Sequence, residues 1–90
     1  SEDGVLILVA TRTPEDGAVA RPELIARGFT GADELIEETR DEASRVLDEL
    51  LSGDVSEIKL LQEHLHDAVG QLIYDRTRRR PMILPVIVEV

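Results

Sequence analysis

The sequence predicts an α+β fold, a three-stranded mixed β-sheet with two antiparallel helices packed on one face, in the order β-β-α-α-β. Apolar runs without polar alternation occur near both ends of the chain, at 5–9 and 82–88. Such runs are typical of strands buried on both faces. Between them, two long segments place apolar residues at helical spacing. The 90 residues suffice for one small domain, 1–90, and not for two.

The first third of the chain predicts a hairpin. The apolar stretch 4–12 reads as a strand, and the segment 14–17 ends in Asp-Gly, a hairpin turn signal. A second strand is expected over about 18–28, with several charged residues and with Pro22 near its start. Because proline removes a ladder donor, this second strand should lie at an edge with one wet face.

The middle of the chain predicts two helices. Thr30 can cap the first, with Asp33 three residues later in a variant of the capping box. Gly53 is a suitable C-cap, and the second helix should run from 55 or 56 to 79. The first apolar stripe comprises Ala32, Leu35, Ile36, Ala43, Val46, Leu47, Leu50 and Leu51. The second comprises Ile58, Leu61, Leu65, Ala68, Val69, Leu72 and Ile73.

The short connection between the helices makes them antiparallel, so the last strand should run parallel to the first. Pro81 ends the second helix, and the strand begins at Met82. The apolar first strand is expected in the centre, between the other two. Pro85 agrees with an edge position for the last strand and also blunts that edge, so a partner should pack against a face of the sheet.

Composition excludes several classes of function. The chain has no cysteine, which rules out disulfides, thiolate metal sites and cysteine nucleophiles. A net charge of −9 argues against a dedicated nucleic-acid surface, because binding a polyanion begins with neutralising phosphates. No apolar run approaches the length of a membrane span. We expect a cytoplasmic protein that has no membrane partner.

No catalytic or metal site is predicted. His64 and His66 are two residues apart, and on a helix such side chains point ~200° apart, so they cannot converge on one ion. No serine stands in a G-x-S-x-G elbow, and no glycine-rich loop follows a strand. We therefore expect no catalytic residue, no metal and no cofactor in this domain.

Four arginines near the end of the second helix allow two interpretations. They are Arg76, Arg78, Arg79 and Arg80. As structural residues they stabilise the C-terminal end of the helix, where the helix dipole is negative, and they neutralise neighbouring acids. As an alternative they contact RNA phosphates and guide RNA along a larger surface.

The element order also resembles a KH RNA-binding core. KH domains have a G-x-x-G clamp between their helices, but the connection 52–56 has one glycine and no basic residue.

Two segments resemble a known family, the bacterial ribonucleases J. The closing residues Arg79 to Val90, RRPMILPVIVEV, resemble the closing segment of that family. The residues Pro22 to Phe29, PELIARGF, resemble its "PEIISRGF" segment in the same order. The helices between them match in pattern, so the resemblance covers nearly all 90 residues as one C-terminal domain.

The resemblance implies an accessory domain. Ribonucleases J combine a metallo-β-lactamase and a β-CASP domain, and they degrade and process RNA as 5′-to-3′ exonucleases and endonucleases with zinc or another divalent metal. Their C-terminal domain serves in dimer or tetramer assembly and supports activity. The catalytic H-x-H-x-D-H motif is absent here, since His64-Leu65-His66-Asp67 has another order. RNA would be met only through the parent enzyme.

Two helices can cover only one face of the sheet, so the other face is expected to bind a partner. The open set is either Val5, Ile7 and Val9 or Leu6 and Leu8, together with either Ile83 and Ile87 or Leu84, Val86 and Val88. The candidate interface residues are Leu6, Leu8, Ile83, Leu84, Val86 and Ile87. The expected partners are a second copy, bound through two-fold symmetry, and the catalytic domains of the same parent protein.

Overall fold

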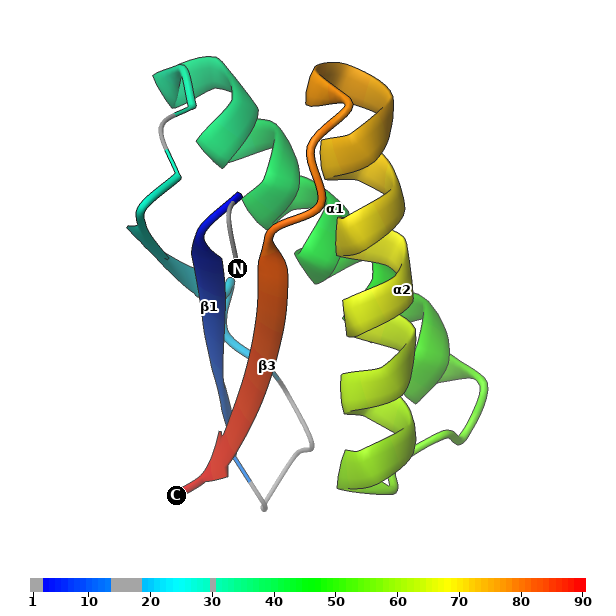
Figure 1. The fold of residues 1–90 in the computed structure, drawn as a ribbon. Coiled ribbons are helices and arrows are strands. Elements are labelled where there is room, and N and C mark those ends of the chain that lie inside the picture. The colour runs from blue at the N-terminus through cyan, green and yellow to red at the C-terminus, as the bar shows by residue number, and fades with distance from the viewer. Residues whose placement is uncertain (1–2, 14–18, 30) are drawn as a thin grey trace.

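The computed structural model describes residues 3–13, 19–29 and 31–90. The elements follow the predicted order (Figure 1). They are β1 (Val5–Arg12), β2 (Glu23–Arg27), α1 (Asp33–Ser52), α2 (Ile58–Thr77) and β3 (Met82–Glu89). The α+β class and the β-β-α-α-β order are confirmed.

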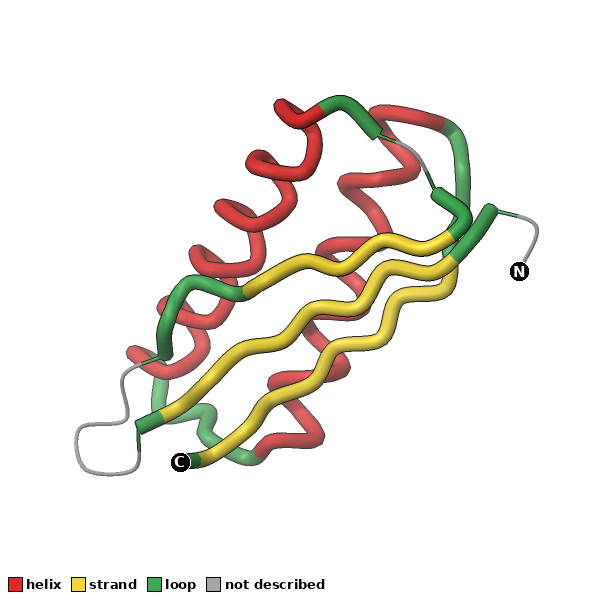
Figure 2. Tube along the Cα trace, turned by 90° about the vertical axis from the view of Figure 1, so that its left-hand side faces the viewer, coloured by secondary structure: helices red, strands yellow, loops and turns green. Residues whose placement is uncertain are grey.

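The sheet has the strand order β2-β1-β3, with β1 in the centre. β1 pairs antiparallel with β2 and parallel with β3, as the lengths of the connections predict. The two antiparallel helices connect β2 to β3, and both lie on the same side of the sheet (Figure 2). β2 and β3 are therefore edge strands, which agrees with prolines before one and within the other.

The core lies between the helix pair and one face of the sheet. From β1, the side chains of Leu6, Leu8 and Ala10 are each 1% exposed. The apolar stripes of the helices pack against them, and the core is aliphatic apart from Phe29. The helix residues of this core are Ala43, Leu47, Leu61, Leu65, Val69 and Ile73. Leu60 and Tyr74, which fall off the predicted stripe, are exposed and half-buried respectively.

The helix boundaries differ from the prediction by a few residues. The N-cap of α1 is Ala32, whose side chain offers no capping bond, while the predicted cap Thr30 lies outside the described residues, as does the turn 14–17. Gly53 caps the C-terminus of α1 as predicted, its N–H donating to carbonyls of the last turn. α2 ends at Thr77, earlier than predicted, because Arg78 adopts a left-handed conformation (φ 59°) and ends the helix before Pro81 acts.

β2 is shorter than predicted. It begins at Glu23, and the only pairing of the described residues before it is a bridge between Val19 and Arg12. Pro22 precedes the strand and is buried, and its carbonyl accepts a hydrogen bond from Arg40 of α1 at 2.8 Å. The continuous pairing of β2 with β1 therefore begins directly after this proline.

Ion pairs join the segment before β2 to α1. Arg21 donates to Glu37 at 2.9 Å and to Asp41 at 2.7 Å, and Arg40 pairs with Glu37 at 3.2 Å. The hydrogen bond from Arg21, followed by the one from Arg40, holds the pKa of Glu37 below its usual value. These groups are exposed, so each pair adds little stability on its own.

Candidate interaction site: the open sheet face

The face of the sheet opposite the helices is apolar and bears no helix among the described residues (Figure 2). Leu84, Val86 and Val88 of β3 are 42%, 39% and 43% exposed. Met82 of β3 and Ile25 of β2 are exposed on the same side. The side chains of β1 that alternate with the core residues, namely Val5, Ile7 and Val9, are half-buried between their neighbours. We call this set, with Arg27 and Glu23 of β2, the open face.

The strand register arranges the open face in three rows that span all three strands and a fourth, Thr11 with Val88, that spans only β1 and β3. The middle row runs Ile25, Ile7, Leu84 across the strands. Arg27, Val5 and Met82 form the row at one end. Glu23, Val9 and Val86 form the row at the other end. The face therefore has an apolar centre and one charged residue of each sign, both on the β2 edge.

Four of the six predicted interface residues lie on the other face. Leu6, Leu8, Ile83 and Ile87 are at most 8% exposed and pack against the helices, so they are core residues. Their assignment to the open face was wrong. A strand that is apolar at every position carries no alternation from which to tell its inner from its outer side chains. Leu84 and Val86 do lie on the open face, and their contact with a partner stays a prediction.

The free edge of β3 is a poor site for a further strand. The amide of Met82 donates to the carbonyl of Gly4 at 2.8 Å, and the amide of Val90 donates to the carbonyl of Arg12 at 3.1 Å. Strand amides alternate in direction, so Ile83, Pro85 and Ile87 direct their backbone nitrogens toward the free edge. Pro85 thus costs no bond to β1 and removes a donor from the edge. The edge is blunted, and the face remains the surface available for contact.

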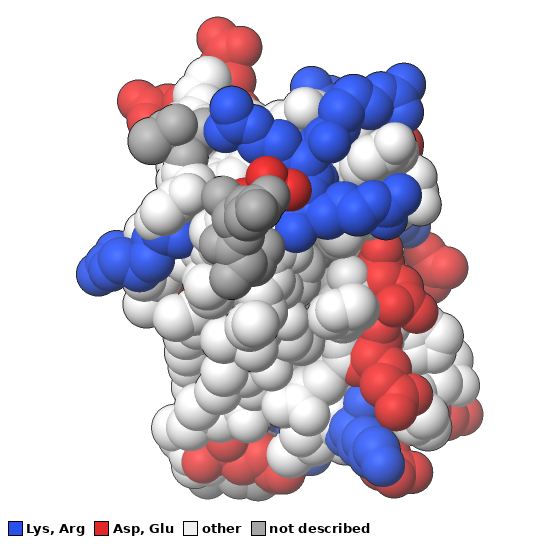
Figure 3. Space-filling model, viewed as in Figure 1, with Lys and Arg blue, Asp and Glu red and all other residues white. Residues whose placement is uncertain are grey.

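The arginine cluster has mainly local partners. Arg76 forms two bonds to Glu38 of α1, at 2.6 and 3.1 Å. Arg78 and Arg80 place their guanidinium groups 5.2 and 4.1 Å from the centre of the Tyr74 ring. These cation–π contacts and the helix end account for the positions of Arg78 and Arg80. Figure 3 shows basic side chains gathered at the end of the molecule where α2 gives way to β3.

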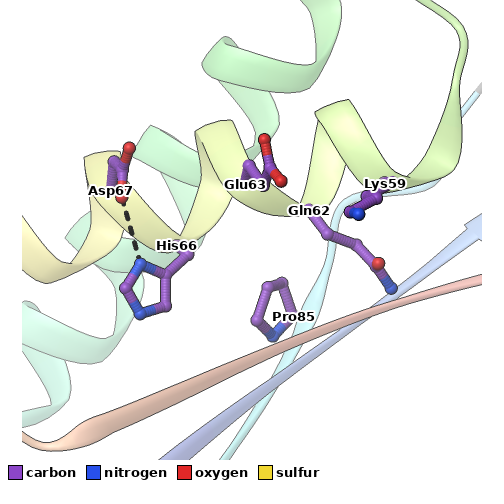
Figure 4. Close-up of a pocket in the computed structure, with 6 residues that line it drawn as sticks. All are labelled: Lys59, Gln62, Glu63, His66, Asp67 and Pro85. Carbon is purple, nitrogen blue, oxygen red and sulfur yellow. Dashed lines mark hydrogen bonds and ion pairs between the residues drawn. The ribbon is translucent and has the colours of Figure 1, made fainter.

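The two histidines of α2 do not share a site. His66 lines a shallow groove between α2 and β3 together with Glu63, Asp67 and Pro85 (Figure 4). His64 lines a different groove, between α2 and α1. Among the residues that the structure describes, the His66 side chain is bonded only to the neighbouring Asp67, at 3.1 Å. The described residues contain no group of three side chains that could hold a metal ion.

The connection between the helices lies at the opposite end of the helix pair from the arginine cluster (Figure 1). It comprises 53–57, with Gly53, Asp54 and Glu57, and has no basic side chain. A KH-type clamp needs glycines and cations at this connection. The chain therefore shares the element order of KH domains but lacks the residues with which they hold a nucleotide backbone.

Neither described helix is long and apolar enough to cross a membrane.

Comparison with known proteins identifies the family. The family model described as Ribonuclease J C-terminal domain matches residues 1–90. Ribonuclease J2 of Bacillus subtilis (strain 168) is 35% identical over the whole chain. Ribonuclease J 2 of Staphylococcus epidermidis is 33% identical, and that of Staphylococcus aureus 31%. The chain spans 17% of the length of these relatives. It belongs to the ribonuclease J C-terminal domain family.

Proposed function

We propose that this chain is the assembly domain of a ribonuclease J. It joins copies of an RNA-degrading and RNA-processing nuclease whose catalytic domains lie outside this chain, and by doing so it supports their activity. The open face is the observation that supports this role. Exposed residues of β3 and β2 surround three half-buried residues of β1, which makes a continuous apolar surface on one side of the sheet. Such patches mark interaction surfaces.

The energetic argument follows from area. Covering apolar surface contributes about 25 cal/mol per Å². Two strands of eight residues and one of five, ~4.8 Å apart and with ~3.3 Å per residue, make a face of at most roughly 15 by 26 Å. A face of this size, about 400 Å² per subunit, is smaller than the ~800 Å² per partner of standard stable interfaces, so we expect weak association, in the micromolar range. Self-association should be stronger in the parent protein than in this chain alone, because its further domains add contacts or avidity.

We assign catalysis and the divalent metal to the absent domains. In this chain, the order His64-Leu65-His66-Asp67 does not match the H-x-H-x-D-H motif, and the two histidines line different grooves. A catalytic zinc needs three converging protein ligands. The isolated chain should therefore neither cleave RNA nor retain zinc. Its negative charge and lack of cysteine support a cytoplasmic location.

Sedimentation of the 90-residue chain over a wide concentration range tests the assembly role. Leu84→Asp, on the open face, should yield a folded monomer. Leu60→Asp is the matched control, because Leu60 is a leucine of nearly equal exposure (41% against 42%) on α2, away from the open face. The control should associate like the unmodified chain. A monomeric unmodified chain at high micromolar concentration, or equal effects of the two changes, contradicts the proposal.

Guidance of RNA to the nuclease core is the second candidate. Arg78, Arg79 and Arg80 form no ion pair with any carboxylate among the described residues, which leaves three cations at one end of an acidic domain. Phosphate contacts would make RNA affinity fall steeply with salt. A salt titration of RNA binding to the chain and to Arg79→Glu distinguishes the two. Negligible binding near physiological salt favours the assembly role. Measurable binding that Arg79→Glu weakens, with a reduced salt slope, favours RNA guidance.

A further inference from the structure

The two charges on the open face occupy positions related by symmetry about its middle row. Arg27 and Glu23 lie on the same strand, on the same face, two residues to either side of Ile25. Four residues of strand separate them by roughly 13 Å. Arg27 lies in the row with Val5 and Met82, and Glu23 in the row with Val9 and Val86. An axis drawn across the strands through the middle row therefore exchanges the two positions.

Both side chains are available to a partner. Arg27 is exposed, and within the described part of the chain its guanidinium donates only to the carbonyl of the preceding Ala26, at 2.9 Å. Glu23 pairs with Arg40 at 3.3 Å, yet its side chain is 75% exposed. Neither charge is neutralised by the other within one chain, since they stand four residues apart on an extended strand.

We propose that the occupant of the open face is a second copy of this chain, related by a two-fold axis that crosses the strands along the row Ile25, Ile7 and Leu84. This inference rests on the proposed assembly function and specifies its geometry. In this arrangement Arg27 faces Glu23 of the partner subunit, and Glu23 faces the partner's Arg27. Each dimer gains two rim ion pairs around an apolar centre, because an isologous interface repeats every contact.

Charge complementarity selects this axis over the other face-to-face arrangement. A two-fold axis along β1 would place β2 over the partner's β3. Arg27 would then face the partner's Met82, and Glu23 the partner's Val86. Each charge would lose water against an apolar side chain with no opposite charge to compensate. Both axes keep the strands of the two sheets nearly aligned, a common geometry for packed sheets, so the charges and not the alignment distinguish them.

Complementary charge reversals test the geometry in the 90-residue chain. Arg27→Glu alone should put two acids opposite each other at both rims, and Glu23→Arg alone should put two arginines there. Each variant should self-associate roughly tenfold more weakly than the unmodified chain. The chain with both changes should recover, because it restores opposite charges at both rims. Glu23→Arg also removes the partner of Arg40. Glu23→Gln, which removes that partner without adding a cation to the open face, is the control for this loss.

Mixing the two single variants is the decisive measurement. In a heterodimer of Arg27→Glu with Glu23→Arg, both rims again hold opposite charges. Native mass spectrometry separates this heterodimer from the homodimers by mass, and it should dominate an equimolar mixture with an affinity near that of the unmodified chain. The control mixes Lys59→Glu with Glu23→Arg, since Lys59 is exposed on α2 and gives the same change in net charge as Arg27→Glu. The control mixture should show no preference for the heterodimer.

The outcomes separate this inference from the assembly function. If the unmodified chain associates and Leu84→Asp is a monomer, but the mixture shows no more heterodimer than the control, the open face is an interface and the proposed axis is wrong. If the unmodified chain is a monomer, both proposals fail. If both the test mixture and the Lys59→Glu control mixture prefer the heterodimer to the same extent, net charge alone explains the preference and the proposed pairing of Arg27 with Glu23 is wrong.

Discussion

The two faces of the same three strands differ in what covers them. On β1, Leu6, Leu8 and Ala10 are covered by the helices and are each 1% exposed, whereas Val5, Ile7 and Val9 are shielded only by their neighbours within the sheet. All six are apolar, and alternate residues differ only in the direction of the side chain. The two apolar faces of β1 therefore have different surroundings. One is covered by the fold, and we propose that the other is covered by a partner.

The largest expected effect comes from placing the same charge on each face. Leu8→Asp should unfold the chain, because it buries a carboxylate in the core and removes aliphatic contacts, at a cost on the order of 4 kcal/mol or more. Leu84→Asp should leave the fold intact and abolish association. Circular dichroism and urea unfolding measure the first effect, and sedimentation the second. Unfolding by both changes would show that the open face already supports the monomer.

The glycine at the start of β1 tests whether both faces depend on the β1–β2 pairing. Gly4 has φ 87°, and a Cβ there would lie 2.5 Å from backbone atoms of Gly28. Gly4→Ala should cost on the order of 2–4 kcal/mol in urea unfolding, because the strands must separate. Gly28→Ala is the control. It also has positive φ, but its nearest contact is 3.5 Å, so its cost should be about 1 kcal/mol. Equal costs would contradict the close approach.

A smaller effect concerns the arginine end. Arg78 is the left-handed C-cap of α2, where glycine is the favoured residue. Arg78→Gly should relieve backbone strain, which offsets the loss of a cation–π contact and of a favourable dipole charge, so stability should change by less than about 1 kcal/mol. Arg78→Glu and Arg79→Glu should each cost about 0.3–1 kcal/mol. Thermal unfolding measures both series. If Arg78→Gly proves more costly than Arg78→Glu, the contact with Tyr74 dominates.

The smallest effect is the acid response of α1. The pKa of Glu37 is lowered in the folded chain, so its ion pairs stabilise the fold above the usual pKa near 4.5, and this stabilisation is lost as the pH falls below that value. Glu37→Gln should therefore flatten the decline of stability in acid. Glu34→Gln is the control, an exposed acid of the same helix without an ion pair among the described residues. Urea midpoints over a pH series give the comparison, and identical profiles would argue against the Arg21 contact.

Sequence reasoning predicted most of the fold. The hairpin signal, the two apolar stripes and the short helix connection predict the element order, the parallel pairing of β1 with β3 and the central position of β1, and the structure confirms all three. Gly53 as a C-cap was also predicted, because cap chemistry acts within one helical turn. The end of α2 was missed, since Arg78 adopts positive φ without the glycine that usually signals it.

The sequence by itself determined which segments pair, which edges are protected and that more apolar surface exists than two helices can cover. These properties depend on local spacing and on the composition of each strand. The tertiary structure alone decided which alternate side chains of β1 and β3 are inside. It also decided that Arg76 reaches Glu38 across the helix pair and that Arg27 and Glu23 flank one row of the open face. Such relations depend on strand register and helix placement, which bring together residues far apart in the chain.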